Sequence, residues 1–337
     1  MSSWGADRTE EWEQELRWAM AEAVVMWWHT PDQPHAAFEP FREMFQALES
    51  VFTRILEIES ASTALEARTL AYCIQCVWLG GLLGVTKSPG PEPDSTMQPI
   101  SLALVDYAVT GPALDVASML APPVEFVAIS HPPNVSIDGT SPREQILAAA
   151  IEVLVDLGPT DFSLKEVARR AGKQEPAISR YYGGRAALLA EAGVKIMEAQ
   201  SAERLATLSR LATGVGTEEQ LLQFGVEVVA SASDGEAAEL RRSVFSALVA
   251  ARQDPEAMGA IGAAFDLFLN EVEAIFSLFA DRGLIAQRFE YASAAEFMAR
   301  LIVGRAFFDA DPLMSISDDQ FRLLVAMIFV QVLAAAG

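Results

Sequence analysis

The segment from residue 143 to residue 190 places Ser, Gly and Pro where short helices must begin and end. Ser163 is followed three residues later by Glu166, the spacing of a capping box that opens a helix. Gly172 stands where a sharp turn needs a residue that accepts a positive φ angle. Pro176 falls in the first turn of the next helix, where its missing N–H would have no partner anyway. This order predicts a helix-turn-helix.

Apolar residues in the same segment recur at the three- and four-residue spacing of one helix face. The predicted first helix, which ends near Gly158, carries the stripe Ile146, Leu147, Ala150, Ile151 and Leu154. The predicted second helix carries Leu164, Val167, Ala168 and Ala171 on its inner face. The small side chain of Ala168 allows the two helices of the motif to cross closely.

The whole chain is predicted to be all-α. Hydrophobic residues make up 51% of it, and long stretches are rich in Ala, Leu and Glu with few runs of β-branched residues. The N-terminus is acidic and has no apolar core, and no uninterrupted apolar run reaches the ~18 residues of a membrane span. We therefore expect a cytoplasmic protein with no membrane contact.

Charge is distributed unevenly along the chain. The formal net charge is -22, yet residues 141–190 hold 7 basic and 6 acidic side chains. Residues 1–130 hold 6 basic and 18 acidic side chains, and residues 191–337 hold 11 and 21. An acidic body repels phosphates, so any contact with DNA must be local and depend on a few cations.

The chain also shows a candidate internal repeat. Residues 36–52, "AAFEPFREMFQALESVF", align without a gap with residues 263–279, "AAFDLFLNEVEAIFSLF", at an offset of 227 residues and with seven identities. Duplication and chance similarity between amphipathic helices both remain open. A Pro- and Gly-rich stretch at 109–142 reads as a linker, with room for one short helix.

The stretch "REQILAAAIEVLVDLGPTDFSLKEVARRAGKQEPAISRYYGGRAALLAEA" resembles the DNA-binding region of the TetR family of repressors. The resemblance implies a helix-turn-helix domain at 143–190 and a helical ligand-binding and dimerisation lobe at 191–337. With the repeat, it would make residues 1–108 a second, headless lobe of similar type. It also implies a ligand-responsive regulator, most naturally a repressor, that binds double-stranded operator DNA and a small lipophilic molecule.

The resemblance carries the family's DNA contacts onto nine residues of this chain. They are Ser163, Lys173, Glu175, Pro176, Ala177, Ser179, Arg180, Tyr181 and Arg185. Glu175 departs from the expected chemistry, because an acid accepts only from cytosine N4 and otherwise repels phosphate. Ser179 stands where the family usually has a phosphate-binding Tyr, Tyr181 replaces the usual His, and Arg185 replaces the usual Lys. The scaffold therefore matches better than the reading surface, and a module whose head has weak or lost DNA affinity stays open as an alternative.

Candidate ligand-binding residues lie in both helical blocks. Trp27 and Trp28 are adjacent and so cannot both face one core stripe, while Phe265 and Phe268 recur in the C-terminal block. Arg300 and Arg305 lie in apolar helices, where they could bind an acidic group of a ligand. The alternative is that they form ion pairs with Glu296 and Asp309. An ordinary aromatic core is the corresponding alternative for the Trp and Phe residues.

The headless lobe would present the same pairing surface as the C-terminal lobe. We therefore predict a pseudo-symmetric pair of lobes inside one chain, with "LAYCIQCVWLGGLL" and the helix around residues 97–109 facing residues near 297–308 and 319–335. Pairing of two chains as a further homodimer stays open, as does a true start upstream of the numbered one.

No pattern indicates an enzyme, and no cofactor is expected. Cys73 and Cys76 have the C-x-x-C spacing, but they lie in an apolar helix with no second pair and no nearby His. A structural zinc site needs four ligands, so two small core residues are the better interpretation.

Overall fold

A computed structural model of the protein describes most of the chain. The described residues are 39–58, 66–82, 94–110, 139–231, 255–285, 290–309 and 313–333, with 135, 137, 242, 245, 246, 249 and 311. The regular elements within these ranges are α-helices, so the predicted all-α fold is confirmed. Trp27 and Trp28 lie outside the described residues.

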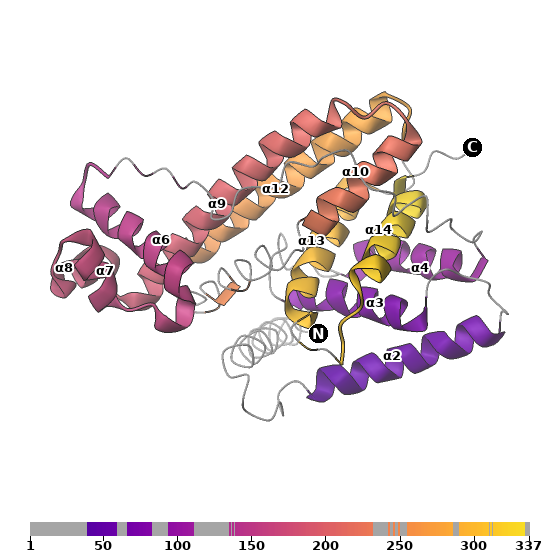
Figure 1. Ribbon diagram of the computed structural model, residues 1–337, viewed down its shortest axis with the longest axis horizontal. Coiled ribbons are helices and arrows are strands. Elements are labelled where there is room, and N and C mark those ends of the chain that lie inside the picture. The colour runs from indigo at the N-terminus through magenta and orange to yellow at the C-terminus, as the bar shows by residue number, and fades with distance from the viewer. Residues whose placement is uncertain are drawn as a thin grey trace, which may run out of the picture.

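The helices fall into three parts: a head at one end of the longest axis, and two lobes packed side by side at the other end (Figure 1). The head, at one end, contains α6 (Pro142–Asp161), α7 (Leu164–Ala171) and α8 (Glu175–Tyr182). The C-terminal lobe contains α9 (Arg185–Ala212), α10 (Glu218–Ser231), α12 (Pro255–Asp281), α13 (Tyr291–Phe308) and α14 (Asp318–Leu333). The front lobe contains α2 (Glu39–Ile58), α3 (Ala67–Leu82) and α4 (Asp94–Thr110).

Local signals in the sequence set the start and the end of α6. Ser141 and Glu144 form a reciprocal capping box, with Pro142 in the first turn. Near its end Gly158 adopts a φ of 72°, a left-handed conformation that ends the regular helix where the sequence predicted a break. All five residues of the predicted α6 stripe are buried, as are Val167 and Ala168 of α7. The predicted stripe of α6 is therefore confirmed, whereas Leu164 and Ala171 of the predicted inner face of α7 are only partly buried against the core.

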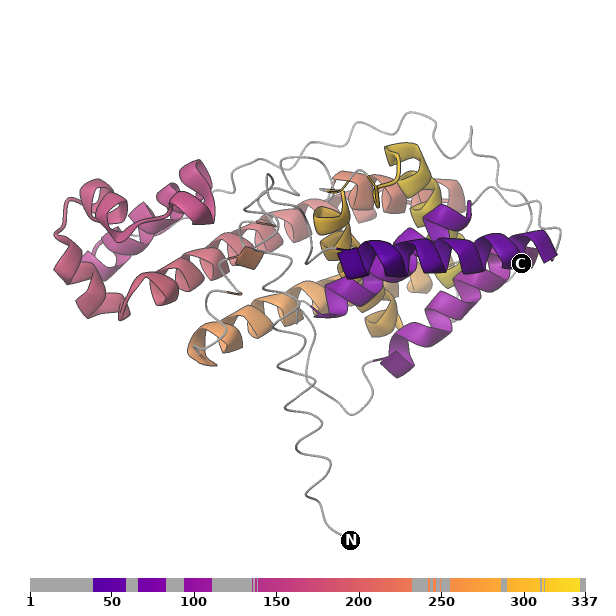
Figure 2. The ribbon, with the colours of Figure 1, turned by 90° about the horizontal axis from the view of Figure 1, so that it is seen from below.

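The helix α9 connects the head to the C-terminal lobe without interruption. It has 28 residues, which corresponds to a length of about 42 Å. Beyond the head α9 packs against α12, and the two helices run side by side in Figures 1 and 2. The predicted breaks near Gly214 and Gly283 fall between helices, whereas those near 254 and 312 lie outside the described residues.

The front lobe packs on the C-terminal lobe through α3, which crosses α13, and through α4, which contacts α13 and α14. The crossing of α3 and α13 is close at two points. A Cβ atom at Gly80 would lie 2.7 Å from the Cα atom of Arg300, and a Cβ atom at Gly304 would lie 2.5 Å from the Cα atom of Cys76. Each helix therefore uses a glycine to admit the backbone of the other.

Polar side chains of the front lobe also bond to the C-terminal lobe. The Tyr72 hydroxyl donates to Asp309 Oδ1 at 2.6 Å, and Arg42 Nε donates to Asp311 Oδ2 at 2.7 Å. Arg68 Nη2 donates to the carbonyl oxygen of Leu313 at 2.7 Å. Burial raises the pKa of the Tyr72 hydroxyl well above its usual value, so it stays a donor. These bonds fix the orientation of the two apolar surfaces.

The structural correspondence of the two lobes differs slightly from the sequence alignment. The starts of α3 and α13 are 224 residues apart, as are the starts of α4 and α14 and the two close-contact glycines. The sequence alignment uses an offset of 227 residues. Three residues are nearly one helical turn, so both offsets align similar apolar faces. The duplication itself stays a prediction.

Candidate nucleic-acid interface

The first helix of the motif, α7, is held at both ends. The Ser163 side chain accepts a hydrogen bond from the backbone N–H of Glu166 at 3.2 Å. Gly172 adopts a φ of 62° and ends the helix, and its N–H points to the carbonyl oxygens of Ala168 and Arg169. The Ser163 hydroxyl, predicted to contact DNA, therefore caps α7. Only half of the predicted capping box forms, because the Glu166 carboxylate turns to two arginines instead.

The second helix, α8, has an anchored inner face. Ile178 and Tyr182 are buried, and the Tyr182 hydroxyl donates to the carbonyl oxygen of Arg143 at 2.7 Å. The Arg143 guanidinium lies 5.0 Å from the centroid of the Tyr182 ring and pairs with Glu191 at 2.8 Å. This anchoring connects α8 to the first turns of α6 and α9.

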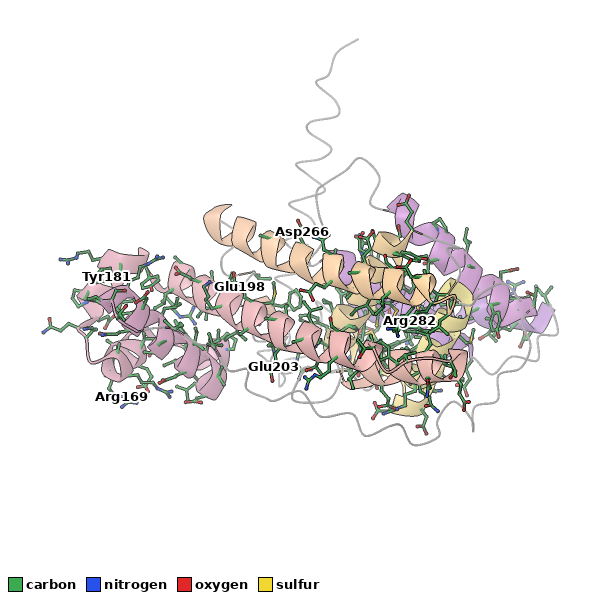
Figure 3. All side chains as sticks on the ribbon, turned by 90° about the horizontal axis from the view of Figure 1, so that it is seen from above. Arg169, Tyr181, Glu198, Glu203, Asp266 and Arg282 are labelled. Carbon is green, nitrogen blue, oxygen red and sulfur yellow. The ribbon has the colours of Figure 1, made fainter. Side chains whose placement is uncertain are left out.

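The outer face of α8 consists of residues that the sequence predicted to contact DNA. Glu175, Pro176, Ser179, Arg180 and Tyr181 are exposed, while Lys173 and Ala177 are partly buried. Figure 3 places Tyr181 and Arg169 at the far end of the head, away from the lobes. The exposed face of α8 thus brings most of the predicted residues together on one surface.

Two features of this face bear on binding. The Arg180 guanidinium lies 5.7 Å from the centroid of the Tyr181 ring, so the cation and the hydroxyl-bearing ring sit together. Glu175 is exposed in the first turn of α8, where the partial positive charge of the helix N-terminus stabilises a carboxylate. The same carboxylate opposes phosphate at the end of the helix that would enter the groove.

Further cations of the head are used in ion pairs. Arg169 bonds Glu166 at 2.5 Å, and Arg170 bonds both Glu166 at 3.0 Å and Asp156 at 2.5 Å. Hydrogen bonds from Arg169 and Arg170 lower the pKa of the Glu166 carboxyl to about 2. The Arg169 side chain is 69% exposed, so its pair with Glu166 contributes little to stability, whereas the Arg170 and Glu166 side chains are partly buried.

Arg185, predicted to contact a DNA phosphate, bonds to backbone carbonyl oxygens of the head instead. Its Nε donates to the carbonyl oxygen of Phe162 at 2.9 Å, and its Nη2 donates to the carbonyl oxygen of Pro159 at 2.7 Å. Arg185 therefore ties the start of α9 to the end of α6. An arginine side chain has five N–H donors, so those of Arg185 that remain could also bond a phosphate. The two carbonyl bonds, however, already fix the orientation of its guanidinium.

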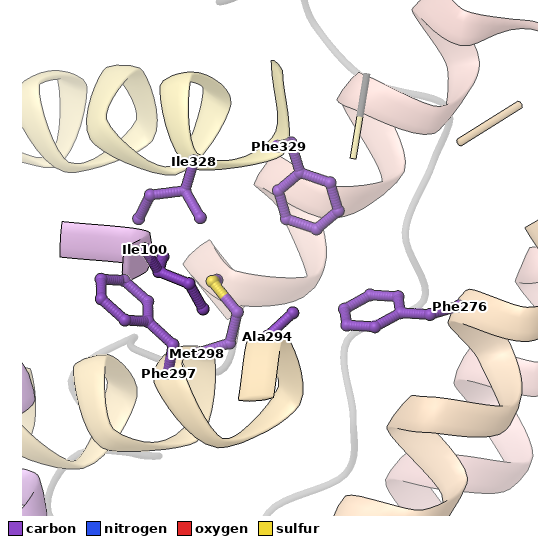
Figure 4. Close-up of a pocket in the computed structure, with 7 residues that line it drawn as sticks. All are labelled: Ile100, Phe276, Ala294, Phe297, Met298, Ile328 and Phe329. Atoms are coloured by element: carbon purple, nitrogen blue, oxygen red, sulfur yellow. The ribbon is translucent and has the colours of Figure 1, made fainter. Parts of the chain in front are cut away.

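Two adjoining apolar cavities lie in the C-terminal half. The larger is partly open to solvent and has Arg204 as the one charged residue among the described residues that line it. Its other lining residues are Leu208, Phe224, Val228, Val229, Val272, Ile275, Phe276, Ala295, Met298, Ala299, Ile302 and Phe329. The smaller is lined by Ile100, Phe276, Ala294, Phe297, Met298, Ile328 and Phe329 (Figure 4).

The predicted ligand-binding residues map poorly onto these cavities. Phe265 and Phe268 lie within α12, but their side chains lie outside the described part of the chain. Arg300 and Arg305 line neither cavity and form the ion pairs that were their alternative, Arg300 with Glu296 at 2.6 Å and Arg305 with Asp309 at 2.8 Å.

Sequence reasoning missed the residues that do line the cavities. Arg204 lies far along the sequence from every residue predicted to bind a ligand. Phe329 lies in an apolar helix whose sequence is typical of a hydrophobic core. A helical-face analysis of α9 would have found Arg204, because Leu208 lies one turn further along the same face.

Cys73 and Cys76 are buried side chains of α3, as expected for core residues. Burial raises the pKa of both thiols, which disfavours the thiolate that a metal site needs. The described residues contain no cluster of His, Cys, Asp or Glu suited to a metal ion. Within the same described ranges, no helix is both long and apolar enough to cross a membrane.

Comparison with known proteins identifies the head. Residues 146–192 match the sequence model of the family described as "Bacterial regulatory proteins, tetR family". The matched range contains the helix-turn-helix and the start of α9. The sequence of the head is thus similar to the helix-turn-helix segment of that family. No curated protein matches the chain.

Three solved structures show distant similarity. A protein from Mesorhizobium loti described as a TetR-family transcriptional regulator is 18% identical, with a TM-score of 0.37, over 50% of this chain and 96% of that one. A TetR-family protein from Vibrio parahaemolyticus is 17% identical, with a TM-score of 0.37, over 58% and 100%. NalD, the secondary repressor of the MexAB-OprM multidrug efflux pump in Pseudomonas aeruginosa, is 22% identical, with a TM-score of 0.37, over 59% and 100%.

Proposed function

We propose that the protein is a ligand-responsive transcriptional repressor that binds operator DNA through one helix-turn-helix per chain. The observation that carries the proposal is the head itself: an anchored α8 whose outer face is exposed, within a segment that matches a family of bacterial regulators. An eight-residue helix is about 12 Å long, close to the ~12 Å width of the major groove. The role is that of a non-enzymatic regulator in the cytoplasm.

The contacts would be divided between phosphates and bases. Lys173, Arg180 and Tyr181 lie beside or on α8 and would bond phosphates, since their side chains donate to anionic oxygens. Glu175, Pro176 and Ala177 open the helix and would face base edges. Arg185 and Ser163 would act chiefly by holding the helices in place, and would reach phosphate with the donors that remain.

Release by a small lipophilic molecule would act through α9. This helix begins at the head and passes the larger apolar cavity, where Arg204 and Leu208 contribute to the lining. A molecule in the cavity would favour one position of α9 and therefore one position of the head. The ligand would lower DNA affinity only by the ratio of its own affinities for the two positions.

The arrangement of the lobes supports a pseudo-dimer within the chain. The proposed units are a headless lobe at 1–108, a linker at 109–142, the head at 143–190 and a second lobe at 191–337. Reciprocal contacts support the proposal: Gly80 admits Arg300 and Gly304 admits Cys76, at one constant separation in sequence. A single head per pair of lobes leaves room for a further homodimer that would supply the second head.

A binding titration against DNA from upstream of the chain's own gene tests the proposal. Two to four phosphate contacts per head predict that log K falls with log salt at a slope of about -2 to -4. Glu175→Gln should strengthen binding by about threefold, because it removes a negative charge from the groove. Glu219→Gln, an exposed acid on α10, is the matched control and should leave affinity unchanged. Weaker binding by Glu175→Gln would mean that the acid reads a base.

A second candidate is a ligand-sensing module whose head has weak or no DNA affinity. Glu175 is exposed on the reading face, and Arg169 and Arg170 are held by Glu166, which favours this alternative. Absent binding, or equally weak binding to the upstream DNA and to a scrambled duplex, would support it and overturn the repressor.

A further inference from the structure

The contact between the two lobes has the pattern of a two-fold symmetric pair. Gly80 of α3 admits the backbone of α13 at Arg300. In the reverse direction, Gly304 of α13 admits the backbone of α3 at Cys76. Gly80 and Gly304 are 224 positions apart in the sequence, and Cys76 and Arg300 are separated by the same number. Exchanging α3 with α13 therefore turns one contact into the other, which is the property of an isologous interface.

The same exchange holds for the neighbouring helices. The helix α4 packs on α13 and α14, and α14 packs on α3 and α4 (Figure 1). The starts of α4 and α14 are 224 positions apart, as are those of α3 and α13. Exchanging the two helix pairs therefore maps this set of contacts onto itself. The four helices α3, α4, α13 and α14 thus form one pseudo-symmetric contact, here termed the lobe contact.

Within the single chain, α13 and α14 are covered almost completely. Residues 297–308 of α13 are all buried, and so are residues 323–329 of α14. An isologous contact is closed, because each of the two surfaces is used once. A second copy of the chain would therefore find these residues already occupied by α3 and α4.

Association of two copies through another surface is opposed by charge. The formal net charge of the chain is -22, and a net charge this far from zero keeps proteins apart. Val51 and Ile58 of α2 are exposed apolar side chains, but they lie two helical turns apart. Leu102 of α4 is exposed on a different helix. Apolar side chains exposed singly are normal on monomeric proteins.

We propose that the lobe contact takes the place of pairing between chains, so that one chain with one head is the unit that binds DNA. Its target is then an asymmetric site read from a single major groove, and the further homodimer left open above is not formed. The proposal rests on the DNA binding proposed above. It adds the class of DNA site and the number of chains on each site.

The class of site follows from the number of recognition helices. Dimeric helix-turn-helix proteins place two recognition helices ~34 Å apart, one turn of DNA, and therefore read sites with two-fold symmetry. The described part of this chain supplies one such helix, α8, whose eight residues are about 12 Å long. One α8 occupies one stretch of major groove, so the sequence it reads needs no inverted repeat.

Sedimentation and footprinting of the full chain test the proposal. The free chain should have the mass of one copy, 36.4 kDa, at both low and high micromolar concentration. Hydroxyl-radical footprinting on DNA from upstream of the chain's own gene should show one protected stretch per strand, with one chain bound. The total salt slope should be about -2 to -4, half of that for two heads. Two protected stretches about 10 base pairs apart, with two chains bound, would overturn the proposal and leave the repressor in place.

Two glycine variants test whether the lobe contact is what keeps the chain single. Gly80→Val obstructs α3 but leaves α13 with Gly304, so two copies can pair through α13 and α14. The mass of Gly80→Val should double at high concentration, and its footprint should gain a second stretch. Gly304→Val removes the glycine that either kind of pairing needs, and should give no two-copy species. Gly262→Val is the control, because Gly262 is exposed and a Cβ atom there meets nothing within 4 Å.

The outcomes are distinct. If Gly80→Val folds, as judged by thermal unfolding, and stays a single copy, the covering of α13 does not prevent pairing and the proposal is overturned. If Gly80→Val does not fold, the mass and footprint of the unmodified chain decide. A two-copy mass together with specific DNA binding overturns the single-chain unit alone. If the unmodified chain binds no upstream DNA, the proposed repressor and the proposed class of site are both overturned.

Discussion

Arginine–carboxylate pairs occur both in the head and at the contact between the lobes, but in opposite environments. In the head, the Arg169 side chain is 69% exposed and pairs with Glu166 at the surface of the head. At the lobe contact, the Arg305 side chain is 6% exposed and pairs with Asp309 and Asp318, with its guanidinium 3.7 Å from the centroid of the Phe321 ring. Exposed pairs break at low cost, whereas a buried pair that loses one partner leaves a charge without compensation. The Arg169 pair of the head can therefore break at low cost when another anion approaches, whereas breaking the Arg305 pairs at the lobe contact costs more.

The largest expected effect is at the lobe contact. Gly304→Val should lower the free energy of unfolding by about 3 kcal/mol, because its Cβ atom would lie 2.1 Å from the Cys76 carbonyl oxygen and force α3 and α13 apart. Denaturant unfolding measures the loss. Gly259→Ala is the control, since a Cβ atom at Gly259 meets nothing within 4 Å. Equal stability of Gly304→Val and the unmodified chain would contradict the close crossing.

The next effect compares a buried pair with an exposed one. Arg305→Leu should cost about 2 kcal/mol, less than a fully buried pair because the Asp318 side chain is 84% exposed and keeps its water. Lys195→Met breaks the exposed pair with Glu198 and should change stability by less than about 0.5 kcal/mol. Calorimetric unfolding of both variants gives the contrast, and similar losses for the two would remove the distinction drawn between the regions.

A smaller effect is expected where α9 joins the head. Arg185→Ala should lower stability by about 1 kcal/mol through the lost bonds to the carbonyl oxygens of Phe162 and Pro159. It should also weaken binding to every DNA duplex by a similar factor, since no base contact is removed. Arg210→Ala, an exposed arginine near the other end of α9, is the control. Weakened DNA binding at unchanged stability would assign Arg185 to phosphate alone.

The smallest effect is the pH dependence of the ion-pair cluster around Glu166. Its pKa in the folded chain, about 2, lies below the usual 4.5 for Glu. The contribution of the cluster to stability is therefore present above pH ~4.5 and is lost as pH falls toward 2. An NMR titration of the Glu166 carboxyl should give a midpoint near 2, and Arg170→Gln should raise it. A midpoint near 4.5 in the unmodified chain would mean that the ion pairs do not persist in solution.

The motif in the head could be predicted from the sequence because its signals are local. Ser163, Gly172 and Pro176 each set a helix end through their own backbone chemistry, and the structure places those ends as expected. The bonds of Arg185 could not be predicted, because they depend on where the end of α6 lies in three dimensions. The resemblance predicts that Arg185 faces DNA, but it does not indicate that two of its N–H donors are already bonded to backbone carbonyl oxygens.

The register of the two lobes shows a second limit of sequence reasoning. Sequence identities favour an offset of 227, whereas the paired glycines and helix starts share 224. The alignment of Phe38 with Phe265 depends on side-chain similarity. Because similar apolar side chains recur every turn on an amphipathic helix, such an alignment can shift by one turn. Gly80 and Gly304 are set by backbone contact instead, and nothing in the sequence distinguishes them from the other 19 glycines among the 21.

The packing of α3 on α13 within one polypeptide has a consequence for dosage. When two separate chains must pair before they work, the active fraction falls on dilution, and output rises more steeply than the amount of protein. Here the two surfaces are joined by covalent chain, so their contact is unimolecular and persists at a few copies per cell. Each newly synthesised molecule can complete this contact without waiting for another. Expression level would then change the number of assembled lobe pairs in direct proportion, without a threshold.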